Sequence, residues 1–211
     1  MPALWKRLDV SQDVPAFILQ EDEVYYAREY ISKGGYKASE ANQLIMNLKK
    51  PVNRRGQRDW YYKEQAIDRF ARELAAALKD GTVIAAIPSS KCRTDPEYDS
   101  RLVDTLSAAK RYKPSLIVEQ PIVVNATSVA VHAGGSRRPD EIYSNLVWNG
   151  FSHEVHQVLL VDDVLTTGSH FRACKRIILE HCPAAKVARY SRDDGQVNGL
   201  AGGCGGHGCY V

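Results

Sequence analysis

Cysteine is scarce in this chain, net charge is small, and long apolar segments are missing. The 211 residues include 5 cysteines and carry a formal net charge of +3. No apolar run approaches the roughly 18 residues that a membrane-spanning helix needs, so we expect no membrane segment. The N-terminus lacks the apolar core of a secretory signal, and the cysteines do not have the spacing of a disulfide scaffold. These absences indicate a reduced, cytoplasmic setting.

Positive charge gathers between residues 49 and 58, just before Trp60 and Tyr61. Such a basic stretch followed by aromatic rings could bind nucleic acid through phosphate contacts and base stacking. A charged connection between two helices is the commoner structure, and the overall charge is far below that of a typical nucleic-acid-binding domain. We therefore expect no nucleic-acid partner.

Strand and helix patterns alternate from residue 82 onward. One helical pattern begins after Asp95 with Pro96 in its first turn, and another covers residues 169–181. This alternation predicts an α/β fold with a doubly wound, mostly parallel sheet covered by helices. Short apolar runs typical of buried strands occupy residues 83–87, 116–118, 122–124, 158–161 and 186–190.

The same patterns divide the chain into three segments. Residues 1–80 lack the alternation and predict helices, one from a Ser39 cap to Pro51 and one over residues 62–79. Residues 81–191 form the expected core, and the Gly-rich residues 192–211 are expected to form a flexible tail.

Three potential zinc ligands stand in that tail, namely Cys204, His207 and Cys209. Thiolates and imidazoles do bind zinc, but three ligands this close together cannot complete a tetrahedral site alone. We expect no metal there.

Residues 158–170 are the most informative stretch. Four apolar residues predict a buried parallel strand, which Asp162 and Asp163 follow; a small, hydroxyl-rich turn then leads into a helix. Carboxylates can hold hydroxyl groups, and the first amides of a helix attract anions at the carboxyl edge of a sheet. The pattern predicts a site for a sugar phosphate, although two acids near a helix start also occur in ordinary strand-turn-helix units.

This stretch resembles the signature of type I phosphoribosyltransferases, and only His170 departs from it, where the family usually has Thr or Ser. The resemblance implies that Asp162 and Asp163 hold the ribose hydroxyls and, indirectly, Mg²⁺. It also implies a homodimer that uses phosphoribosyl pyrophosphate. The ribose 5-phosphate site would comprise Asp162, Asp163, Val164, Leu165, Thr166, Thr167, Gly168, Ser169 and His170.

Two further segments match the family by position. Ser89, Ser90 and Lys91 follow the first strand of the core, where the family binds pyrophosphate; the alternative is a plain connection with surface cations. Arg137 and Arg138 lie where the family has a mobile catalytic loop, and they could neutralise the departing pyrophosphate. A solvated loop is the alternative there, and His132 is a weaker candidate.

A variable hood selects the acceptor in this family, and residues 1–80 are the candidate here. Tyr25, Tyr36, Trp60 and Tyr61 are available to stack on a base. The sequence does not choose among them, nor does it identify the acceptor.

The expected function is Mg²⁺-dependent transfer of a phosphoribosyl group to a nitrogenous base or amine, with release of pyrophosphate. Asp162, Asp163, Arg137 and Arg138 are the expected catalytic residues. Two alternatives stay open: a regulator of the same fold that senses phosphoribosyl pyrophosphate or a nucleotide, and a hydrolase with water as acceptor. No helix-turn-helix or other DNA-reading module supports the regulator.

Overall fold

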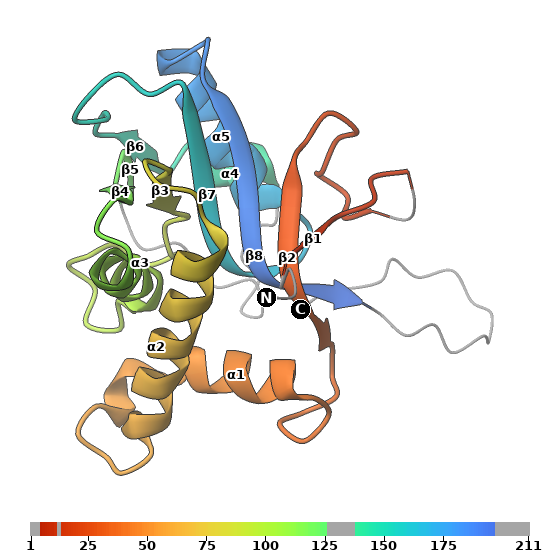
Figure 1. Ribbon diagram of the computed structural model, residues 1–211, viewed down its shortest axis with the longest axis vertical. Coiled ribbons are helices and arrows are strands. Elements are labelled where there is room, and N and C mark those ends of the chain that lie inside the picture. Colours follow the sequence, from red (N-terminus) through yellow and green to blue (C-terminus); the bar gives the residue numbers. More distant parts are fainter. Residues whose placement is uncertain (1–4, 12–13, 126–137, 197–211) are drawn as a thin grey trace.

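A six-stranded sheet forms the centre of the computed structural model, which describes residues 5–11, 14–125 and 138–196 (Figure 1). The strand order is β1-β2-β8-β7-β3-β4, and every neighbouring pair is parallel except β1 with β2. The fold is therefore α/β with a mostly parallel sheet, as the sequence predicts. The strands are β1 (Lys6–Arg7), β2 (Val24–Ile31), β3 (Val83–Ala86), β4 (Ile117–Glu119), β7 (Gln157–Leu165) and β8 (Lys186–Gln196).

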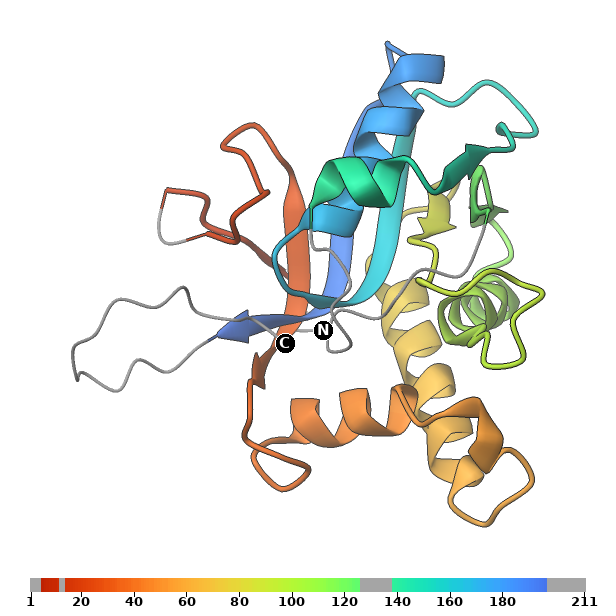
Figure 2. The ribbon, with the colours of Figure 1, turned by 180° about the vertical axis from the view of Figure 1, so that it is seen from behind.

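Helices cover both faces of this sheet. On one face α1 (Glu40–Leu48), α2 (Trp60–Ala77) and α3 (Arg101–Tyr112) share an apolar core with the strands. On the other face α5 (Ser169–His181) packs on the sheet, and α4 (Pro139–Tyr143) lies against α5 (Figure 2). The smaller elements are the 3-10 turn η1 (Val52–Arg54) and a two-stranded antiparallel sheet of β5 (Ile122–Val124) and β6 (Leu146–Trp148).

Strand β7 is central and buried on both sides. Leu159 and Val161 enter the core beneath α2 and α3, whereas Val158 and Leu160 enter the core beneath α5. Because consecutive side chains of a strand point to opposite faces, a strand covered on both faces reads as an unbroken apolar run. The expectation for residues 158–161 is confirmed.

The N-terminal segment is less helical than expected. Residues 24–31 form β2, which pairs with β8 inside the main sheet, so a purely helical hood over residues 1–80 is not confirmed. The aromatic and alanine residues of β2 lack the continuous aliphatic run that predicts a buried parallel strand. At the other end β8 continues to Gln196, so the first residues of the expected tail are strand.

Two further expectations differ in detail. Helix α3 begins at Arg101 and not after Asp95, because the Asp95 carboxylate accepts a hydrogen bond from the Glu97 amide at 2.8 Å and closes a turn. Residues 122–124 are a strand, but in the small second sheet. Within the described ranges, no helix is both long and apolar enough to cross a membrane.

Asn42 anchors α1 to the sheet. Its buried side chain accepts a hydrogen bond from the Ile31 amide at 3.0 Å and donates to the carbonyls of Ile31 and Gly35 at 2.9 and 3.0 Å. The Ser39 hydroxyl caps the same helix by accepting from the Asn42 amide, as the sequence predicts. The anchor fixes the end of α1 relative to the central strands.

We expect Asn42→Ala to lower the free energy of unfolding by about 2–3 kcal/mol, because it leaves buried backbone groups without partners. Urea denaturation measures the change, and Gln43→Ala, at an exposed position of the same helix, should change it by less than about 0.5 kcal/mol. Equal effects of the two substitutions would contradict the anchoring role.

Candidate functional site

A cleft of about 630 Å³ opens where β3 and β7 end. The two strands are parallel neighbours, with Ala86 opposite Val161, so the segments that follow them meet at the same edge of the sheet. Both segments singled out in the sequence therefore contribute to one cavity. The predicted residues that line it are Ser89, Ser90, Lys91, Asp162, Asp163, Val164, Thr166 and His170.

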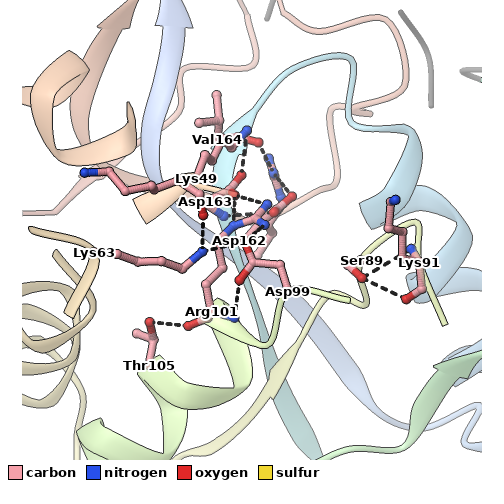
Figure 3. A network of polar contacts seen from close by, with 12 residues as sticks. Lys49, Lys63, Ser89, Lys91, Asp99, Arg101, Thr105, Asp162, Asp163 and Val164 are labelled. Carbon is pink, nitrogen blue, oxygen red and sulfur yellow. Dashed lines mark hydrogen bonds and ion pairs between the residues drawn. The ribbon is translucent and has the colours of Figure 1, made fainter. Parts of the chain in front are cut away.

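The adjacent acids Asp162 and Asp163 engage different faces of the sheet. Asp163 pairs with Lys49, which follows α1, and with Arg101 of α3 (Figure 3). Asp162 pairs instead with Arg189 of β8. The separation follows from strand geometry, since both acids still belong to β7 and consecutive side chains alternate.

Asp163 is almost fully enclosed, with 5% of its side chain exposed. Its Oδ2 atom accepts from Arg101 Nε at 2.8 Å and lies 2.6 Å from Nη2, and Oδ1 lies 3.2 Å from Lys49 Nζ. Burial alone would raise the pKa of this carboxyl, but Lys49 and Arg101 outweigh it and hold the pKa well below its ordinary value. Asp163 is therefore ionised and neutralised by its neighbours.

The pairing continues behind Asp163. Arg101 Nη1 lies 2.9 Å from Asp99 Oδ2, which lies 2.6 Å from the ammonium of the buried Lys63. Lys63 also donates to the carbonyl of Lys50 at 2.7 Å. Burial lowers the pKa of Lys63, and its hydrogen bond to Asp99 opposes that shift. The chain of charges links α1, α2 and α3 to the end of β7.

Asp162 is more open, with 18% of its side chain exposed. Its Oδ2 lies 2.7 Å from Nη2 of the buried Arg189, which also donates to the carbonyl of Val164 at 3.0 Å. Its Oδ1 accepts from the Asp163 amide at 2.8 Å. Beside it His170 is half-buried, and burial lowers the pKa of its imidazole although the negative charge of Asp162 opposes that shift.

The turn before α5 is held from outside by the N-terminal segment. Gly168 adopts a left-handed conformation with φ of 82°, and the Phe17 amide donates to the Thr167 carbonyl at 2.9 Å. A Cβ atom on Gly168 would lie 2.7 Å from Ile18 Cδ1. Leu165, Thr167, Gly168 and Ser169 shape this turn without lining the cleft, whereas Thr166 and His170 face it.

The segment after β3 is also ordered by local contacts. The Ser89 hydroxyl donates to the Lys91 carbonyl at 2.9 Å and accepts from the Lys91 amide at 3.3 Å. The Lys91 ammonium pairs with Glu97 and lies 3.8 Å from Asp95, and Arg93 donates to Gln120. Hydroxyls and cations thus border the cleft opposite the acids.

The other predicted residues lie elsewhere. Arg138 precedes α4 and does not line the cleft, while Arg137, His132 and the tail residues 204–209 fall outside the described residues. None of the hood candidates lines the cleft either; its N-terminal wall is Lys49, Pro51, Val52 and Asn53. The expected hood candidates were Tyr25, Tyr36, Trp60 and Tyr61.

Sequence reasoning missed Lys49, Asp99, Arg101 and Arg189 as site residues. Arg189 carried a usable signal, because it stands between Ala188 and Tyr190 in a predicted buried strand, where an arginine needs an acid as partner. From the sequence alone, Lys49 is expected in a charged connection between two helices. Among the described residues, no three His, Cys, Asp or Glu side chains are grouped as a metal site.

Comparison with known proteins adds little. No protein-family model and no curated protein matches the chain. A solved structure that does match is a hypoxanthine phosphoribosyltransferase from Staphylococcus aureus, with a TM-score of 0.37 and 12% identity. The match covers 62% of this chain and 64% of that one, so the chain spans less than two thirds of its length. At this level of similarity, function is inferred from the residues of the cleft.

We expect Asp163→Asn to lower the free energy of unfolding by about 3–5 kcal/mol at pH 7, because Arg101 and Lys49 lose their buried partner. The folded-state pKa of Asp163 is depressed, so its contribution is complete above the unfolded pKa of about 4 and is lost as pH falls below it. The difference between the native protein and the variant should therefore shrink below about pH 4.

Urea denaturation at several pH values measures this difference, with Glu64→Gln at an exposed position of α2 as the control. A difference that stays constant between pH 3 and pH 7 would show that the charge of Asp163 does not stabilise the fold.

We expect Gly168→Ala to destabilise the protein by about 2–4 kcal/mol, because the substitution combines an unfavourable backbone conformation with a clash against Ile18. Gly150 has a similar φ of 84°, and a Cβ there would meet only Trp148 Nε1 at 4.0 Å, an ordinary contact, so Gly150→Ala isolates the backbone cost, about 1 kcal/mol. Thermal denaturation compares the two variants, and equal losses would exclude the contact with Ile18.

Proposed function

We propose that the protein is a phosphoribosyltransferase, which transfers the phosphoribosyl group of phosphoribosyl pyrophosphate to a nitrogenous base or amine and releases pyrophosphate. One observation carries the proposal. The same cleft is bordered by Asp162 and Asp163, by Thr166 and His170 of the turn that follows them, and by the hydroxyl-rich segment 89–91 after β3. This matches the order of sites in the family whose signature residues 158–170 resemble.

Each part of the donor has a candidate partner. Asp162 is the more exposed acid, so it is the better ligand for ribose hydroxyls, while Asp163 is enclosed by cations and holds them in place. The turn from Thr166 to His170 begins α5, a helix of 13 residues whose first amides and dipole favour a 5′-phosphate. Ser89, Ser90 and Lys91 would receive the diphosphate.

The carboxylates suit a Mg²⁺ ion that is held mainly by its substrate. Asp162 is the more exposed of the two acids and is therefore the one placed to reach a hydrated ion. Mg²⁺ commonly takes few protein carboxylates and keeps several waters. When bound to the diphosphate, the ion would neutralise charge on the leaving group.

In the proposed reaction the bond between the anomeric carbon and the diphosphate oxygen breaks, and a bond from that carbon to the acceptor nitrogen forms. The pair of electrons leaves with pyrophosphate, and the acceptor loses a proton. Asp162 would stabilise the positive charge that develops on the sugar. Most of the rate enhancement would come from positioning and electrostatics. The catalytic roles of Arg137 and Arg138 stay predictions. The homodimer is also a prediction.

A screen of bases by thermal shift, with phosphoribosyl pyrophosphate and Mg²⁺ present, would identify the acceptor, because a bound ligand raises apparent stability. Release of pyrophosphate with the selected base then tests the reaction. Ribose 5-phosphate formed without any base would assign a hydrolase, and binding without pyrophosphate release would assign a sensor.

We expect Asp162→Asn to lower the rate of pyrophosphate release by at least about tenfold, because the ribose hydroxyls and the developing positive charge lose a carboxylate. The asparagine Oδ1 can still accept a hydrogen bond from the Asp163 amide, and Arg189 can still donate one to the Val164 carbonyl. Glu64→Gln removes a surface carboxylate and should leave the rate unchanged. Full activity of Asp162→Asn would remove this acid from the mechanism.

A further inference from the structure

Lys49 occupies an unusual place in the buried charge network. It directly follows α1 in the N-terminal segment, yet its ammonium lies 3.2 Å from Asp163 Oδ1 at the floor of the cleft. Its side chain is 41% exposed, whereas the side chain of Asp163 is 5% exposed. Asp99, Arg101 and Asp163 also line the cleft, but Lys49 has the most exposed side chain of the network.

The network is electrically balanced without Lys49. Arg101 neutralises Asp163 through two short contacts, and Lys63 neutralises Asp99 at 2.6 Å. These contacts join two cations and two anions, and Lys49 adds a third cation. The Asp162–Arg189 pair is balanced separately. Lys49 therefore leaves a positive charge at the floor of the cleft.

Lys91, the cation that the sequence predicts for the pyrophosphate site, differs from Lys49 because neighbouring acids offset its charge. Lys91 pairs with Glu97 and lies near Asp95, so its charge is offset by acids of its own loop. For an anionic ligand in the cleft, the positive charge of Lys91 is already offset by acids, whereas the positive charge of Lys49 is in excess of the acids around it. An ammonium has three donors, and the contact with Asp163 uses one of them, so Lys49 can bind a phosphate oxygen without leaving the network.

From this charge balance we infer that Lys49 binds the diphosphate of the donor, an inference that rests on the proposed function. The residue lies in the same cleft as Ser89 and Ser90, on the N-terminal wall that continues through Val52 and Asn53. The N-terminal segment thereby contributes to recognition of the donor, in addition to any role with the acceptor. Asn42 supports this position by fixing α1 on β2.

Calorimetry with two ligands tests the inference. Phosphoribosyl pyrophosphate carries the diphosphate, and ribose 5-phosphate lacks it. Lys49→Gln should weaken binding of phosphoribosyl pyrophosphate about tenfold, as expected for the loss of one charge-assisted contact, and should change binding of ribose 5-phosphate less than about twofold. Lys49→Arg should restore most of the affinity, and Lys37→Gln, at an exposed position before α1, should change neither ligand.

The outcomes separate the inference from the proposed function. Binding of neither ligand to the native protein would overturn both. Equal weakening of both ligands by Lys49→Gln would show that Lys49 acts only by positioning Asp163, and unchanged binding would remove it from the site. The thermal midpoint of Lys49→Gln should stay within about 2 °C of the native value, because the remaining network is balanced. An unfolded variant would overturn the charge argument.

Discussion

The rest of the structure depends on two adjacent carboxylates at the end of a central strand, Asp163 buried and Asp162 partly exposed. Both faces of β7 are covered, so the buried charge of Asp163 needs cations close by, and Asp162 has an arginine partner of its own. Strand alternation sends the acids toward different faces, and each face must supply its own partner. Arg189 serves Asp162 from β8, and Arg101 and Lys49 serve Asp163 from α3 and the end of α1. This requirement fixes how three elements approach the end of β7.

The same requirement makes the two acids functionally unequal. Asp163 is enclosed and pairs with Lys49 and Arg101, which line the cavity. Asp162 is partly exposed in the cleft that Thr166 and His170 also line. A floor that combines one accessible carboxylate with surplus positive charge suits a ligand that has both hydroxyl groups and phosphates. The proposed donor fits this arrangement, with its diphosphate toward Lys49 and the Ser89 segment and its 5′-phosphate toward the start of α5.

Local patterns predicted the parts of the molecule that are fixed by neighbouring residues. The strand at residues 158–161, the helix at 169–181 and the Ser39 cap all depend on periodicity or on a contact within one turn. The partners of the acids were not predictable in this way, because Arg101 and Arg189 lie 62 and 27 residues from them in the sequence. The predicted start of α3 after Asp95 was wrong for a different reason, because the Asp95 side chain competes with the helix for the backbone amide of Glu97. Strand β2 was missed because its core-facing residues after Val24 are tyrosines and an alanine.

A crystal structure of the protein with phosphoribosyl pyrophosphate would test the account most directly. We expect the 5′-phosphate at the turn that begins α5, the ribose hydroxyls on Asp162, and the diphosphate between the Ser89 segment and Lys49. We also expect that Asp163 keeps its contact with Arg101 and does not touch the sugar. A ligand whose diphosphate lies away from both segments, or whose ribose is held by Asp163 in place of Asp162, would contradict the central claim.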